Sequence, residues 1–192
     1  MKISNLVPFF FLILWSCGGD YMPKPKGYNF IDLPDHEYKL FQEEGAPFSF
    51  EYSKHSMVLD DTTGFTGEYW KVVDYPDFDS KIHLTYYTLK EDSNSLNRMI
   101  EDARKLAAKH MVKASGMDEM EFVGRNGSIN HIYSIGGEVP SQCQFYSHDS
   151  TDHFMRGALY FQTAKKNDSL RPIIDFVVKD LNHLLNTLEW SK

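Results

Sequence analysis

The chain has 192 residues, with 20 lysines and arginines against 27 aspartates and glutamates, which gives a formal net charge of −7 at pH 7. Because it is mildly acidic and has no cluster of basic residues, it offers neither a surface for nucleic acid nor a basic stripe for anionic lipid headgroups. Its length is sufficient for one domain with a hydrophobic core of its own. We therefore expect no nucleic-acid partner.

Residues 1–16 predict a signal peptide. Lys2 supplies a positive charge near the start, and an unbroken apolar run follows from Leu6 to Trp15. A run of about ten apolar residues is too short to cross a bilayer as a helix, but it is typical of a secretory signal peptide that is removed from the mature protein. The alternative is an uncleaved N-terminal anchor with an incidental cysteine.

The end of this segment, with Leu14, Ser16 and Cys17, resembles the lipobox of bacterial lipoproteins. The resemblance implies that Cys17 becomes the first residue of the mature chain and carries lipid on its sulfur and on its new amino group. A multiply acylated terminus holds a protein at a membrane firmly, whereas a single acyl chain does not. Membrane attachment would then rest on the acyl chains alone.

Cys143 is the second of the two cysteines in the chain. If Cys17 is acylated, Cys143 has no partner for a disulfide within the chain. We expect a small buried side chain at this position. The alternative is a reactive thiol, but no neighbouring cation is present to lower its pKa.

Residues 17–46 predict a lipidated tether and docking segment ahead of the domain. Over Pro23–Lys26 proline alternates with lysine, a pattern that favours an extended, polyproline-like conformation. Ile31 and Leu33 make the following stretch too apolar for a simple spacer, so we expect it to lie against the surface of the domain. A single α+β domain is expected over 47–192.

From Pro47 onward the pattern predicts β-strands. Phe48, Phe50 and Tyr52 alternate with polar residues, which indicates a strand with one buried face. The pair Asn126-Gly127 predicts a type I′ hairpin turn, since both residues tolerate positive φ. The same signals place predicted strands at 48–52, 67–73, 81–89, 120–125, 128–133, 142–147 and 153–162.

Two amphipathic helices are also predicted. Apolar residues recur at three- and four-residue spacing from Leu96 to Met111, and Gly116 ends this run. A second helix has Pro172 in its first turn and an apolar face that extends to Leu188. The order of elements indicates an α+β fold, an antiparallel sheet covered by two main helices. It resembles the Mog1/PsbP-like sandwich, which implies no function by itself.

The densest group of metal-capable side chains is His148, Asp149, Asp152 and His153. Two imidazoles and a carboxylate suit zinc, so His148, Asp152 and His153 are candidate ligands if the loop folds back on itself. The alternative is a solvated hairpin tip that is rich in turn-forming residues. We favour the hairpin tip and expect no metal.

Motifs of common enzymes are missing from the sequence. No serine lies in a Gly-x-Ser-x-Gly elbow, and no phosphate-binding or dinucleotide-binding glycine loop occurs. We therefore expect a protein that is not an enzyme, with no catalytic residues and no cofactor.

The segment Tyr21–Tyr28, followed by Ile31–Pro34 and His36–Tyr38, resembles the N-terminal signature of the GldD gliding-motility lipoproteins of Bacteroidota. Residues 47–52 and the lipobox fit the same family. The resemblance implies an envelope lipoprotein that is needed for gliding and is associated with the type IX secretion apparatus. The matching residues, which would either bind a partner or seat the tether on the domain, are Pro23, Lys24, Pro25, Gly27, Tyr28, Asp32, Leu33, Pro34, His36 and Tyr38.

Two functions remain open from the sequence. The favoured one is a lipid-anchored, non-catalytic interaction or assembly subunit whose partners are the membrane and other gliding and type IX secretion proteins of the envelope. The alternative is a periplasmic lipoprotein that binds a ligand or a metal at His148–His153. Because Gly18-Gly19-Asp20 lacks the acidic run that often follows the cysteine in surface-exported lipoproteins of this phylum, we expect a periplasm-facing anchor, in either membrane of the envelope.

Overall fold

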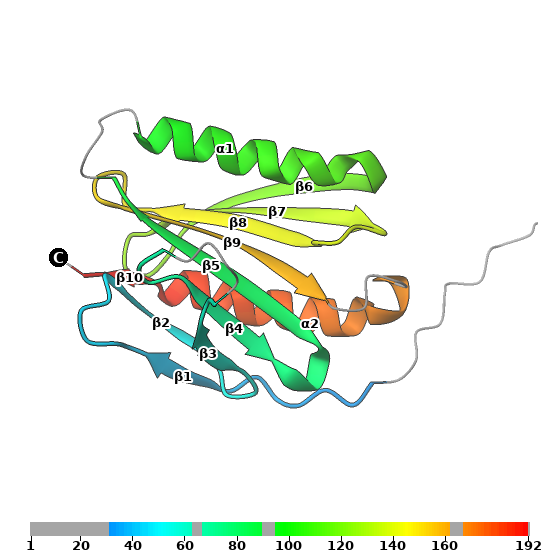
Figure 1. Cartoon of the computed structure of the whole chain (residues 1–192). Helices are drawn as coiled ribbons and strands as arrows, with labels where there is room; N and C mark the ends of the chain where they lie inside the picture. Colours follow the sequence, from blue (N-terminus) through cyan, green and yellow to red (C-terminus); the bar gives the residue numbers. More distant parts are fainter. Residues whose placement is uncertain (1–30, 63–66, 90–94, 162–166, 192) are drawn as a thin grey trace, which may run out of the picture.

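The computed structural model describes residues 31–62, 67–89, 95–161 and 167–191 (Figure 1). Cys17 and the predicted signal peptide lie outside these residues. In chain order the elements are β1 (Tyr38–Phe41), β2 (Phe48–Ser53), β3 (Met57–Asp60), β4 (Lys71–Tyr75), a 3₁₀ turn (Pro76–Phe78), β5 (Ser80–Thr88), α1 (Ser95–Lys109), a second 3₁₀ turn (His110–Lys113), β6 (Ala114–Val123), β7 (Ile129–Gly137), β8 (Cys143–His148), β9 (His153–Phe161), α2 (Asn167–Thr187) and β10 (Glu189–Trp190).

Most of the strands form one antiparallel sheet of seven, in the order β3-β4-β5-β9-β8-β7-β6. Strands β1, β2 and β10 form a smaller antiparallel sheet with β2 in the middle. Helix α1 lies over one face of the larger sheet and α2 lies against the other face (Figure 1). The predicted fold class, an α+β fold in which two main helices cover an antiparallel sheet, is confirmed. Among the described residues, neither helix is both long and apolar enough to cross a bilayer.

Successive residues of a strand point to opposite faces of the sheet, so apolar side chains lie on both faces. Each helix covers one face and forms a separate hydrophobic core with it. Ile132 and Phe145 belong to the core beneath α2, whereas their chain neighbours Tyr133 and Tyr146 belong to the core beneath α1. Strand β8 lies between the two cores, and all of its residues are buried. Strand β8 is therefore shielded from water along its whole length.

Cys143, the first residue of β8, is fully buried in the core on the α2 side. Burial raises the pKa of its thiol to about 12. The thiol therefore remains protonated near neutral pH, which agrees with the expected small core side chain and not with a reactive nucleophile.

One predicted strand begins later than expected. The strand predicted at 67–73 starts only at Lys71, as β4. Before it, Tyr69 adopts a φ of 62°, and the Trp70 amide donates to the Gly67 carbonyl at 3.3 Å. A positive φ at a tyrosine is incompatible with extended backbone, so this part of the chain forms a turn.

The first helix ends earlier than expected. It was predicted to continue towards Gly116, but α1 stops at Lys109 and β6 begins at Ala114. Gly116 is part of β6, next to an irregularity in the pairing with β7. The short strands β1, β3 and β10 were not predicted, since segments of two to four residues carry too little periodicity to be recognised.

The packing around Gly157 of β9 generates a stability prediction. A Cβ atom here would collide with the Phe145 ring and would approach the His83 carbonyl oxygen to 2.5 Å. Because this oxygen belongs to the backbone of a neighbouring strand, it cannot move aside. Gly157→Ala is expected to lower the free energy of unfolding by about 2 kcal/mol, measured by urea denaturation.

Gly116→Ala is the matched control, because a Cβ atom at Gly116 would meet nothing within 4 Å. Its effect should stay within about 0.5 kcal/mol. Equal losses of stability in the two variants would contradict the packing argument.

Candidate functional site

Part of the predicted tether and docking segment forms an extended arm along the domain, here called the N-terminal arm (residues 31–41). Its side chains alternate between two environments. One set is half-buried against the domain and consists of Ile31, Leu33, His36, Tyr38 and Phe41. The other set is exposed and consists of Asp32, Pro34, Asp35, Glu37, Lys39 and Leu40. The arm therefore has an inward face that holds it in place and an outward face that is open to solvent.

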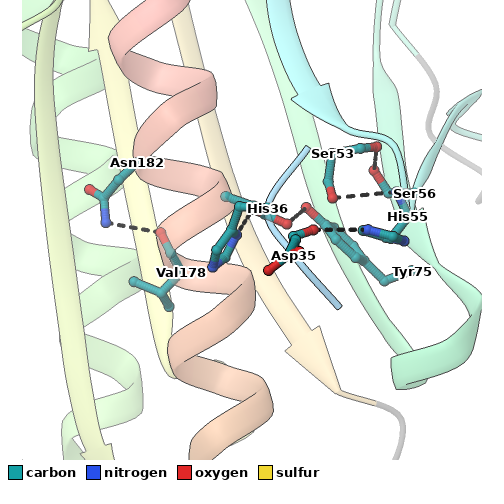
Figure 2. A network of polar contacts seen from close by, with 9 residues as sticks. Asp35, His36, Ser53, His55, Ser56, Tyr75, Val178 and Asn182 are labelled. Atoms are coloured by element: carbon teal, nitrogen blue, oxygen red, sulfur yellow. Dashed lines mark hydrogen bonds and ion pairs between the residues drawn. The ribbon is translucent and has the colours of Figure 1, made fainter. Parts of the chain in front are cut away.

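The inward face is anchored by a buried carboxylate on helix α2. Figure 2 shows His36 between helix α2, which carries Val178 and Asn182, and the strand that carries Tyr75. Nδ1 of His36 lies 2.6 Å from Oδ1 of Asp180, whose side chain is 1% exposed. The imidazole ring also stacks on the ring of Phe176, one helical turn earlier, with centroids 4.2 Å apart. From β4, the Tyr75 hydroxyl donates to the other carboxylate oxygen at 3.3 Å. Both oxygens of the buried group are thus hydrogen-bonded, as a buried charge requires.

The charge of Asp180 contributes to the raised pKa values of two nearby tyrosines. Burial, together with the charge of Asp180, raises the pKa of Tyr38 to about 12. The same causes raise the pKa of Tyr75, which is more deeply buried. Both phenols therefore stay neutral near physiological pH, where they can donate hydrogen bonds.

A second contact holds the arm at Tyr38, two residues after His36. The ring of Tyr38 stacks on His183 of α2 with centroids 3.5 Å apart and an angle of 8° between the planes. Nε2 of His183 in turn lies 2.6 Å from a carboxylate oxygen of Glu51 on β2. Strand β1 then pairs with β2 from Tyr38 to Phe41. The arm is consequently fixed both to the helix and to the smaller sheet.

The structure divides the predicted partner-binding residues into three groups. Pro23, Lys24, Pro25, Gly27 and Tyr28 lie outside the described residues, as does Cys17. Leu33, His36 and Tyr38 face the domain, where they seat the arm. Asp32 and Pro34 are exposed on the outward face.

Asp180, the residue that organises this site, was not predicted from the sequence. A signal was present, because Asp180 follows Phe176 by four residues and precedes Leu184 by four, which places it on the apolar face of the helix. An aspartate on such a face requires a hydrogen-bond partner from another element. The sequence pattern does not say that the partner is His36.

The loop proposed as a possible metal site is held by internal hydrogen bonds. His153 lies with Nδ1 2.8 Å from the Tyr86 hydroxyl and with Nε2 3.1 Å from the Ser191 carbonyl oxygen, so protein groups engage both ring nitrogens. Its ring also stacks on Trp190. Among the described residues, no group of three or more metal-capable side chains converges on one point.

The remaining side chains of this loop form a turn. Burial would raise the pKa of Asp149, but the backbone amides of 151–153 donate to its carboxylate, and the net result is a lowered pKa. Burial lowers the pKa of His148, which favours its neutral form. The acidic residue therefore serves as a hydrogen-bond acceptor for the turn.

Comparison with known proteins identifies the family. The sequence profile of the family described as "Gliding motility lipoprotein GldD" matches residues 18–190. The chain belongs to the GldD family. The resemblance inferred from the N-terminal signature is thereby confirmed, and GldD membership assigns the protein to the lipoproteins of the cell envelope that act in gliding motility. No curated protein matches the chain.

Two solved structures are similar to the GldD domain in fold. One is the cyanobacterial PsbP protein (CyanoP) of Synechocystis sp. PCC 6803, with 8% sequence identity, coverage of 79% of this chain and 95% of that chain, and a TM-score of 0.43. The other is the Ran-binding protein Mog1p of Saccharomyces cerevisiae, with 10% identity, coverage of 81% and 96%, and a TM-score of 0.46. The likeness concerns the fold alone.

The contact between His36 and Asp180 generates a stability prediction. His36→Ala leaves one oxygen of a buried carboxylate without its partner, so the free energy of unfolding should fall by about 2 kcal/mol. Urea denaturation of the full-length protein measures the change. In a protein that already carries Asp180→Asn, His36→Ala should lower the free energy of unfolding by a smaller amount, because no charged group is then left without its partner.

His55→Ala is the matched control. The His55 ring contacts only the exposed Asp35 carbonyl, at 3.1 Å, among the hydrogen bonds of the described residues. Its removal should change the stability by no more than about 0.5 kcal/mol. Similar losses for the two histidines would show that the buried carboxylate is not what holds the arm.

Proposed function

We propose that this GldD protein is a lipid-anchored subunit of the cell envelope that acts in gliding motility as a non-catalytic interaction component associated with type IX secretion. In this proposal residues 1–16 are removed as a signal peptide, and Cys17 carries acyl chains such as palmitate. The domain faces the periplasm. Its partners are other proteins of the gliding and secretion machinery.

The observation that carries the proposal is the two-faced arrangement of the N-terminal arm. Leu33, His36 and Tyr38 hold the arm on the domain, while Asp32 and Pro34 remain exposed. A segment that is fixed on one side and open on the other is pre-ordered for docking, because the entropy of ordering it is lost on folding and not on binding. The outward face lies within the predicted tether and docking segment, so a membrane-bound partner could reach it.

Further along the arm, the outward face carries an exposed apolar side chain. Leu40 of β1 is 61% exposed, and β1 is an edge strand of the smaller sheet. Leu59 on the edge strand β3 is exposed as well, so exposure alone does not mark an interface. Leu40 is distinguished by its place on the outward face of the arm, where it would contact a partner that docks on the arm.

The internal hydrogen bonds of the site support a non-catalytic role. His36, Asp180 and Tyr75 form the kind of group that enzymes use for proton transfer. Here, however, the carboxylate is 1% exposed, and the imidazole is stacked on a phenylalanine ring. The three side chains satisfy one another, so their arrangement is explained by the seating of the arm.

Affinity purification from gently solubilised envelopes of the native cell tests the assembly role. The full-length, lipid-bearing protein should capture known motility or secretion subunits, and Cys17→Ala should lose them because the lipid anchor brings the partners together. Mass spectrometry of the captured proteins gives the readout. Recovery of the protein without any motility or secretion subunit would overturn the proposal.

A gliding assay with two matched variants tests the role of the arm. Leu40→Lys should abolish or strongly reduce gliding, because a charge replaces an exposed apolar contact on the outward face. Leu59→Lys is the control, since Leu59 is also an exposed leucine, 46% exposed, on the edge strand β3 of the other sheet. Both proteins should retain the unfolding midpoint of the unmodified chain. Normal gliding in the Leu40→Lys cells would exclude the arm as the docking surface.

A further inference from the structure

A cleft lies beside helix α1, on the opposite side of the larger sheet from the arm. It has a volume of about 280 Å³. Residues of β5, β7, β8 and β9 form its floor, and the C-terminal half of α1 with His110 forms its wall. The lining includes His83, Gln144, Arg156, Leu106 and His110, together with the carboxylate of Asp61.

Strand register explains why polar groups meet on this floor. Gln144 of β8 pairs with Ala158 of β9, which pairs with His83 of β5. Arg156 of β9 lies opposite Thr85 of β5, two residues along both strands. Directly paired residues, and residues two positions apart on one strand, share a face of the sheet. The floor of the cleft therefore carries polar side chains, whereas the opposite face of the same strands packs in the hydrophobic core beneath α2.

Gln144 supplies the first indication of a ligand. Its side chain is 8% exposed, and its Nε2 is buried without a hydrogen-bond partner among the described residues. A buried amide donor that stays unpaired costs about 1–3 kcal/mol, so native proteins rarely leave one unmatched. The cleft is the space into which this residue faces, and an acceptor atom bound there would complete the hydrogen bond.

Arg156 supplies the second indication. No carboxylate of the described residues lies within ion-pair distance of its half-buried guanidinium. Lys105 and Lys109 line an adjoining hollow together with Arg156, and His110 lies in the wall of the cleft. Lys105 is paired with Glu101 and Asp102, at 3.7 and 4.0 Å. Asp102 lines the same hollow and Asp61 lines the cleft, so carboxylates offset the two lysines. Because Arg156 itself forms no ion pair with a described carboxylate, an anionic ligand would supply the partner that it lacks.

The remaining lining restricts the class of anion. Ala103 and Leu106 give the wall an apolar surface, which suits a carbon skeleton and not a bare inorganic ion. Asp61 places a carboxylate in the lining, where its side chain is only 9% exposed and Oδ2 lies 3.3 Å from Nδ1 of His83. A doubly charged phosphate would be repelled by this group more strongly than a singly charged carboxylate.

We propose that the cleft beside α1 binds a small organic carboxylate. The guanidinium of Arg156 and Nε2 of Gln144 bind the carboxylate group, and Ala103 and Leu106 contact its carbon skeleton. A planar guanidinium matches the two oxygens of a carboxylate, and such charge-assisted hydrogen bonds are stronger than neutral ones. This site is separate from the N-terminal arm and does not depend on the proposed role in gliding.

Isothermal titration calorimetry of the full-length protein in detergent tests the proposal. The probes are hexanoate, D-glucuronate and L-glutamate at millimolar concentration, with hexanamide and inorganic phosphate as the neutral and inorganic comparisons. At least one carboxylate should bind with one site per chain, and hexanamide and phosphate should bind more weakly. Binding of none of the three carboxylates, or equal binding of phosphate, would overturn the proposal.

Two arginine variants identify the site. Arg156→Gln should weaken the binding of the carboxylate by about tenfold or more, since a charge-assisted pair is lost. Arg125→Gln is the matched control, because Arg125 is an exposed arginine in the turn between β6 and β7, outside the cleft lining. Equal affinities in the two variants would place the carboxylate elsewhere on the protein.

Gln144→Leu separates a binding role from a packing role. Leucine is similar in size and removes the unpaired donor, so the free protein should be at least as stable as the unmodified chain in urea denaturation. Binding of the carboxylate should nevertheless weaken. Unchanged affinity in this variant would show that Gln144 only fills the core.

Discussion

The α2 side of the domain depends on one buried carboxylate. Asp180 is 1% exposed, and a charge at such depth is stable only when its oxygens are hydrogen-bonded. His36 from the N-terminal arm and Tyr75 from β4 meet this requirement, so the arm, the larger sheet and helix α2 are joined at a single point. Hydrogen bonds are strong only over a narrow range of distances and angles. This contact therefore favours one position of the arm over other positions that would bury a similar area.

How far the sequence predicts this arrangement depends on the range of each interaction. The alternation over 48–52 and the helical spacing that leads to Leu188 are local patterns, and they correctly predict β2 and the helix α2. Asp180 interrupts the apolar face of that helix, which signals a buried polar contact. Its partner His36 lies 144 positions away, and no local pattern specifies a contact over that separation.

The cleft beside α1 shows a related limit. His83, Gln144 and Arg156 come from three strands, and each is an ordinary polar residue in its own segment. They meet only because β5, β9 and β8 pair in one register, and a shift of one residue would move a side chain to the opposite face. Register is set by the whole sheet, so a candidate site of this type cannot be found before the strands are aligned.

The two candidate sites use opposite faces of the same sheet, and this has an energetic consequence. Strand β5 contributes to both sides, with Leu84 in the core beneath α2 and His83 at the cleft. A ligand changes a distant contact only if it binds two conformations of the connecting element with different affinity. Strand β5 is hydrogen-bonded to β4 on one edge and to β9 on the other, which opposes such a change. Docking through the arm and binding in the cleft are therefore expected to be independent, and the effects of substitutions at the two sites on stability should add.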